Sequence, residues 1–211
     1  MIHTPMFFAA MPQTFLDKFV ALAVDPATGK PNTARFRAFE ASHPDNAGQA
    51  RFLKDNNPPA AYTNCAFYGI HTFRFVNRDN RVTNVRFRFV PQDGERQLTD
   101  GDLETAPRDF LEQALMQRLA QGPANWDMVL TIGEPGDPEN SPTVLLPAGR
   151  KEVKAGTLLI VSATPSAVAG SYRINFDPLV MADGIAPSDD PVLLFRSPSY
   201  ATSYTRRLRG L

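Results

Sequence analysis

Arg196, Tyr200 and Arg207 lie near the C-terminus with types and spacings that suit the binding of iron or an anion. Arg196 and Tyr200 are four residues apart, so on a helix their side chains are neighbours, and Arg207 lies two turns further along the same face. A guanidinium beside a phenol favours the phenolate. A phenolate is a hard ligand for ferric iron, and tyrosine is one of the known proximal ligands of haem. Arg207 could then pair with a carboxylate, and Asp190 could orient Arg196.

The same spacing also has a simpler interpretation. An arginine and a tyrosine at i, i+4 are common neighbours on the surface of a helix and need no metal. Residue types and spacing leave both interpretations open.

Composition limits the class of protein. The chain has 211 residues, 43% of them hydrophobic and 21% charged, which indicates one folded domain and excludes a disordered chain. Lys+Arg and Asp+Glu are both 22, so no excess positive charge favours nucleic acid. One cysteine excludes an internal disulfide framework, and three widely spaced histidines argue against a His-cluster metal site. No run is long enough to span a membrane, and the first residues do not resemble a signal peptide.

Hydrophobic periodicity predicts an α+β fold in which antiparallel strands carry the core. Residues 172–187 are expected to be irregular. The predicted helices are 12–24, one or two polar helices in 33–55 with a break near 42–44, 106–121, and 190–208 with an interruption only near Pro198. The predicted strands are 63–76, 81–90, 126–132 and one within 152–163.

The first two strands are predicted to form a long hairpin with one apolar and one charged face. His71 shares the apolar face with Phe73 and Phe75, where a histidine is typically a hydrogen-bonded core residue. The opposite face carries three arginines. These are Arg74, Arg86 and Arg88. Their face is interpreted as solvent-exposed, with contacts between subunits as the alternative.

At this point the sequence resembles the monofunctional haem catalase family, and most closely its smaller branch, the catalase-related peroxidases. The proximal helix of that family carries an acidic residue, an arginine, the tyrosine ligand four residues later, and an arginine seven residues beyond. Asp190, Arg196, Tyr200 and Arg207 stand at the matching places. The resemblance therefore implies that Tyr200 is the metal ligand of a haem.

The resemblance extends through most of the chain. Phe67-Tyr-Gly-Ile-His-Thr-Phe resembles a barrel strand whose histidine, here His71, joins a hydrogen-bond chain from the acid through His and Arg to the ligand Tyr. Thr4-Pro-Met-Phe-Phe resembles a segment whose phenylalanines line the haem and its access channel. This implies cofactor contacts for Phe7, Phe8 and Phe15. The implied fold is a partial catalase-like antiparallel β-barrel with flanking and C-terminal helices.

The departures from the family are also informative. Ile2 and His3 stand where the family usually has two asparagines, and His3 is interpreted as an exposed imidazole rather than a catalytic base. The family's distal histidine lies on an earlier strand, so no catalytic residue is assigned. Residues 1–211 are expected to be a catalase-like haem-binding domain lacking its N-terminal part, with any signal peptide upstream, so the compartment stays open.

The resemblance implies a haem-dependent oxidoreductase of the peroxidase or catalase type that acts on hydrogen peroxide with an organic reductant, as part of an oxidative stress response. The alternative is a non-catalytic catalase-like fragment that binds haem or is inactive because the distal histidine is absent. Neither a nucleic acid nor a membrane is expected as a partner, and an oligomer is possible.

Overall fold

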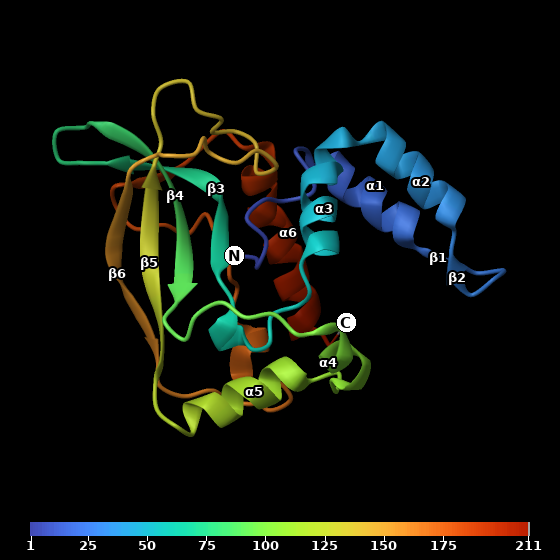
Figure 1. Ribbon diagram of the computed structural model, residues 1–211. Helices are drawn as coiled ribbons and strands as arrows, with labels where there is room; N and C mark the ends of the chain where they lie inside the picture. The colour runs from blue at the N-terminus through green and yellow to red at the C-terminus, as the bar shows by residue number, and fades with distance from the viewer. Residues whose placement is uncertain (211) are drawn as a thin grey trace.

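The computed structural model describes residues 1–210, and its centre is one antiparallel sheet with the strand order β6-β5-β4-β3-β7. Figure 1 shows this sheet on one side of the molecule, with most of the helices beside it. The α+β class and the antiparallel strands predicted from periodicity are therefore confirmed. The strands are β3 (Phe67–Val76), β4 (Val82–Pro91), β5 (Ala124–Ile132), β6 (Glu152–Ile160) and β7 (Ile185–Pro187).

The helices cover one side and the lower end of the sheet. They are α1 (Pro12–Leu22), α2 (Thr33–Ser42), α3 (Ala47–Asp55), α4 (Asp100–Thr105), α5 (Phe110–Leu119) and α6 (Pro191–Leu208), and a small hairpin of β1 (Val24–Asp25) and β2 (Lys30–Pro31) joins α1 to α2. In Figure 1, α6 lies between the sheet and the group α1–α3, and it contacts α1. Within residues 1–210, none of these helices has the length and apolar character to cross a bilayer.

The predicted hairpin is formed by β3 and β4, which pair from Phe67↔Phe89 to Val76↔Val82. The pairing shifts register between Gly69 and Phe73. His71 and Thr72 lie within this irregular stretch and are both buried, because His71 contacts Asp190 and Thr72 accepts a hydrogen bond from Arg86.

Arg86 corrects the sequence-based expectation of a solvent-exposed arginine face. Its side chain is buried, with only 8% of the residue exposed. The guanidinium donates to the carbonyls of Val144, Pro138 and Ser141 at 2.5, 3.0 and 3.1 Å, and Nε donates to Thr72 Oγ1 at 3.0 Å. Periodicity missed this because the loop between β5 and β6, which supplies these carbonyls, folds back over that part of β4.

Arg74 and Arg88 fit the expectation better, since both lie at the surface in ion pairs. Arg74 contacts Asp189 at 2.5 Å, and Arg88 contacts Glu152 at 2.5 Å. Arg88 therefore links β4 to the edge strand β6 across β5.

We expect Arg86→Met to lower the free energy of unfolding by about 2–4 kcal/mol, because the buried carbonyls of the β5–β6 loop lose their donor. Urea denaturation followed by circular dichroism measures this. Arg51→Met is a suitable control, because Arg51 is exposed and its guanidinium pairs with Asp55 on the same helix. Equal urea midpoints for the two variants would contradict the role of Arg86 in holding the β5–β6 loop against β4.

Three helix predictions need adjustment. The helix expected over 106–121 begins at Phe110, and the separate α4 precedes it. Thr99 is the N-cap of α4 and forms a capping box with Asp102. This sequence signal could have predicted the separate helix. α6 continues through Pro198 rather than breaking there. The helix predicted over 12–24 ends at Leu22, and its aromatic residues are only partly covered, since Phe15 and Phe19 are 41% and 54% exposed.

Candidate functional site

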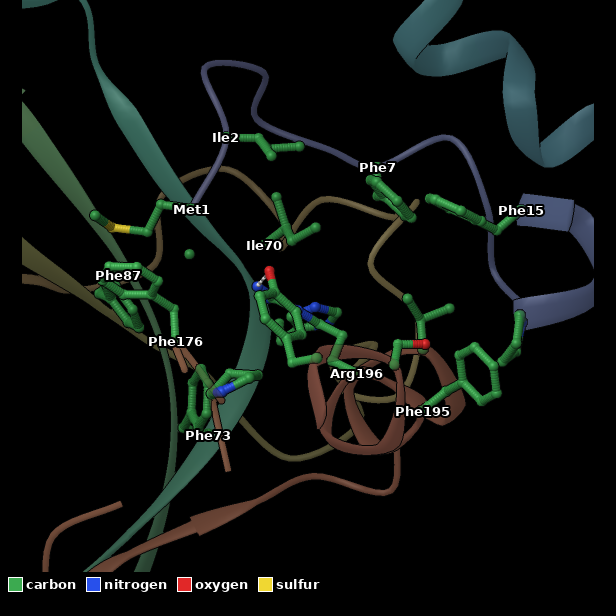
Figure 2. A pocket seen from close by; sticks show the side chains of 17 residues that line it. Met1, Ile2, Phe7, Phe15, Ile70, Phe73, Phe87, Phe176, Phe195 and Arg196 are labelled. Carbon is green, nitrogen blue, oxygen red and sulfur yellow. Dashed lines mark hydrogen bonds between the residues drawn. The ribbon is translucent and has the colours of Figure 1, made fainter. Parts of the chain in front are cut away.

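A cavity of about 550 Å³ lies between the hairpin, α6 and the N-terminal segment. In Figure 2, Phe7 and Phe15 lie towards one side of the view, Phe73, Phe87 and Phe176 lie towards the other, and Arg196 lies between them. Most of the wall is apolar, as expected of a site for a flat organic ligand. The lining residues are Met1, Ile2, Phe7, Pro12, Phe15, Gly69, Ile70, His71, Phe73, Phe87, Phe176, Pro178, Val192, Phe195, Arg196, Ser199 and Tyr200.

Tyr200 and Arg196 bring polar chemistry into this apolar wall. Arg196 Nη2 donates a hydrogen bond of 2.8 Å to the hydroxyl oxygen of Tyr200, as the i, i+4 spacing predicted. The guanidinium carbon also lies 5.2 Å from the centre of the tyrosine ring.

Asp190 fixes the start of the helix that carries this pair. Its side chain has no exposed surface, and Oδ1 accepts hydrogen bonds from the backbone N–H groups of Val192 at 2.8 Å and Leu193 at 3.3 Å. Pro191 follows at the first helical position, where its missing N–H costs nothing. Because a carboxylate at an N-cap also faces the positive end of the helix dipole, Asp190 anchors α6 in the interior.

The second carboxylate oxygen of Asp190 lies 2.7 Å from Nδ1 of His71. Burial lowers the pKa of His71, and the charges of Arg196 and Arg86 lower it further against the opposing effect of Asp190. A neutral His71 that donates from Nδ1 to the carboxylate leaves Nε2 as an acceptor. Nε2 is buried and, within residues 1–210, has no hydrogen-bond partner.

The family resemblance implied a hydrogen-bond chain from Asp190 through His71 and Arg196 to Tyr200, and its first and last bonds are present. Asp190 is joined to His71, and Arg196 is joined to Tyr200. No hydrogen bond joins His71 to Arg196 within the part of the chain that the structure describes. His71, Arg196 and Tyr200 line the same cavity, whereas Asp190 lies behind His71, outside the lining.

The lowered pKa of His71 predicts a loss of stability on mild acidification. An unfolded histidine takes up its proton near pH 6.5, whereas folded His71 does so only at lower pH. The unfolded state therefore binds more protons between these two pKa values, and the free energy of unfolding falls as the pH drops below about 6.5. Urea midpoints measured from about pH 7.5 to about pH 5 are expected to show this decrease.

A His71→Gln variant keeps an N–H donor for Asp190 but cannot titrate, so its midpoints are expected to depend less on pH. His3→Gln is the matched control, since His3 lies on the surface. A pH dependence that is the same in His71→Gln and in the wild type would contradict the prediction.

The predicted phenylalanines divide into two groups. Phe7 and Phe15 line the cavity. Phe8 lies behind them, with ring centres 4.4 Å from Phe7 and 5.5 Å from Phe15, and it is outside the lining. The backbone N–H of Phe7 donates to the carbonyl of Pro142 at 2.8 Å, so the loop clamped by Arg86 also holds the N-terminal segment.

Arg207 lies outside the cavity lining. Its Nε and Nη2 donate to the carbonyls of Tyr172 at 3.3 Å and Ile174 at 3.1 Å, and its Nη1 donates to Ser203. Its guanidinium therefore holds the segment before β7 against α6.

Several lining residues were not identified from the sequence. Phe87 packs over Gly69, its partner across the hairpin, so closely that a Cβ on Gly69 would lie 2.6 Å from the ring. A glycine opposite an aromatic residue in a hairpin is the signal that could have identified this contact. Phe176 and Pro178 come from the irregular segment before β7, for which local patterns predict no position.

Comparisons with known proteins agree with this geometry. A family model described as Catalase matches residues 1–211. A catalase-related peroxidase of Synechococcus elongatus is 47% identical over 211 residues, and one of Mycolicibacterium paratuberculosis is 31% identical over 200 residues. These matches include 100% and 94% of this chain, and the chain spans 62% of the length of each relative.

Solved structures resemble the fold closely. A crystal structure of a fungal catalase superposes with a TM-score of 0.86 at 19% identity, covering 98% of this chain and 44% of that one. Catalase A from Saccharomyces cerevisiae gives a TM-score of 0.86 at 20% identity, covering 98% and 45%. The predicted catalase-like architecture is therefore confirmed.

Proposed function

Because this chain belongs to the catalase family, we propose that it is the part of a haem-dependent oxidoreductase that holds the haem, with the phenolate of Tyr200 as proximal iron ligand. The proposed reaction is the reduction of hydrogen peroxide, with an organic reductant as the electron donor. One observation carries the proposal: the hydroxyl of Tyr200 lies in a largely apolar cavity with Arg196 donating to its oxygen.

The residues of the cavity fit a haem. A flat, mostly apolar macrocycle needs apolar walls, which Phe7, Phe73 and Phe87 supply. Tyr200 would supply the oxygen ligand of the iron, with Arg196 as a hydrogen-bond donor to that oxygen. Haem, when bound, would supply the redox chemistry.

The remaining residues have supporting roles in this proposal. Asp190 and His71 fix the N-terminal end of α6 and so the position of its cavity-facing side chains. Phe7 and Phe15 form the apolar wall on the side of the cavity away from Phe73 and Phe87. Phe8 supports them from behind, and Arg207 supports the segment that carries Phe176.

The alternative, a non-catalytic haem-binding fragment, is favoured by the placement of the histidines. Cleavage of a peroxide benefits from a positioned acid–base group, whose absence costs about 10²–10⁴ in rate. Within residues 1–210, His71 is the only histidine in the cavity wall, and Asp190 holds its Nδ1. His43 bonds to the carbonyl of Phe39 on α2, and His3 lies at a separate hollow.

The test is a haem titration of the 211-residue chain, followed by a turnover assay with hydrogen peroxide and an organic dye as reductant. The proposal predicts saturable binding with a ferric–tyrosinate absorption spectrum, and turnover above that of free haem. Binding with this spectrum but without turnover would favour the non-catalytic alternative. Absence of saturable binding would contradict both.

A further inference from the structure

The segment 172–178, here called the strap, crosses α6 outside any regular strand, and α6 holds it at two places. The first is its N-terminal end. Arg207 donates to the carbonyls of Tyr172 and Ile174, so one guanidinium holds two nearby carbonyls of the strap backbone. Arg207 is half-buried, and this contact ties the strap to the last turns of the helix.

The second attachment lies near the middle of α6. The hydroxyl of Ser197 donates to Oδ2 of Asp177 at 2.5 Å, and both residues are half-buried. The other carboxylate oxygen accepts from the backbone N–H of Leu179 at 2.9 Å, so the carboxylate also shapes the turn that follows. Hydrogen bonds to a charged acceptor are among the stronger ones in proteins.

The residues between and beside these attachments line the cavity. Phe176 and Pro178 flank Asp177, and both belong to the cavity wall. Figure 2 shows Phe176 on the same side of the cavity as Phe73 and Phe87. Phe176 is nevertheless 61% exposed, so packing alone holds it weakly, and its position depends on the attachments of the strap.

Ser197 is also the residue next to Arg196. A movement of the strap therefore acts on the turn of α6 that carries Arg196, which donates to Tyr200. The hydrogen bond between Ser197 and Asp177 couples one apolar wall of the cavity directly to the helix that carries the candidate ligand.

We propose that the hydrogen bond between Ser197 and Asp177 is a latch that positions Phe176 and Pro178 in the cavity wall and thereby slows the escape of a bound aromatic macrocycle. Ser197 and Asp177 are positioning residues in this inference. Its second half rests on the proposed function, because the macrocycle is haem.

The latch itself is tested without haem. Amide hydrogen exchange of residues 174–180, measured by mass spectrometry on the 211-residue chain, is expected to be about tenfold faster in Ser197→Ala than in the wild type. Ser197→Thr keeps the hydroxyl and is expected to restore slow exchange. Thr205→Ala is the matched control on the same helix, since the exposed Thr205 hydroxyl donates to the carbonyl of Ala201 within α6. Unchanged exchange in Ser197→Ala would overturn the latch.

Retention is tested by the rate at which haem transfers from each loaded variant to excess apomyoglobin. Ser197→Ala is expected to release haem about tenfold faster than the wild type, and Ser197→Thr and Thr205→Ala at the wild-type rate. Faster exchange with unchanged release would overturn the retention role. If the wild type takes up no haem, the proposed function and the retention role both fail, while the exchange experiment still decides whether the latch exists.

Discussion

Replacing Tyr200 with phenylalanine is expected to abolish the ferric–tyrosinate absorption spectrum of the haem-loaded chain and to weaken haem binding. The substitution removes the one oxygen that Arg196 supports in the cavity, while the aromatic ring still fills its place. Loss of a partner behind a metal ligand costs about 10–100-fold in affinity, so loss of the ligand itself is expected to cost more. Titration with haem, followed by absorption spectroscopy, gives both the spectrum and the affinity.

Tyr204→Phe provides the control. Tyr204 lies one turn further along α6, its ring lies near Arg207, and it is outside the cavity lining. Its substitution removes a hydroxyl of the same kind from the same helix, so the spectrum and affinity are expected to stay unchanged. A Tyr200→Phe chain that binds haem with the wild-type spectrum would show that the iron ligand is a different residue.

The sequence predicted the parts of the site that depend on local periodicity. The spacing of Arg196 and Tyr200 predicted their contact, because residues four apart on a helix are neighbours whatever surrounds the helix. The alternation in residues 67–90 predicted the hairpin, and Asn80 stands in its turn with φ of 59°, a conformation that asparagine tolerates. The catalase-like architecture was predicted from the family resemblance and not from periodicity.

The sequence did not predict contacts made by loops. Arg86 has the same alternation as Arg74 and Arg88, yet it is buried because distant backbone carbonyls satisfy its donors. No local pattern records which face a later loop will cover. The contact of Ser197 with Asp177 was missed for the same reason, since it joins a helix to an irregular segment twenty residues earlier.

Asp190 shows a third kind of limit. The helix predicted over 190–208 has Asp190 as its first residue, whereas in the structure Asp190 is the N-cap. An aspartate followed by proline at a helix start is a recognised N-cap signal, so this role was open to prediction. Its second bond, to His71, joins residues 119 positions apart, and only the family resemblance had suggested that link.

Asp190→Ala is expected to lower the free energy of unfolding by about 2–5 kcal/mol. Two costs contribute to this loss: α6 loses its N-cap, and the buried N–H of His71 is left without an acceptor. Such a loss is a large fraction of the total stability of a domain, which is about 5–15 kcal/mol. Urea denaturation followed by circular dichroism measures it.

The neighbouring aspartate separates this effect from a general loss of negative charge. Asp189 lies at the surface, where it pairs with Arg74, and surface ion pairs contribute little to stability, so Asp189→Ala is expected to leave the midpoint nearly unchanged. Asp190→Asn keeps an oxygen that can accept from Val192 and Leu193, and it is expected to fall between the wild type and Asp190→Ala. Equal losses in Asp189→Ala and Asp190→Ala would show that the buried carboxylate does not hold the start of α6, and the positioning of Tyr200 would then need another source.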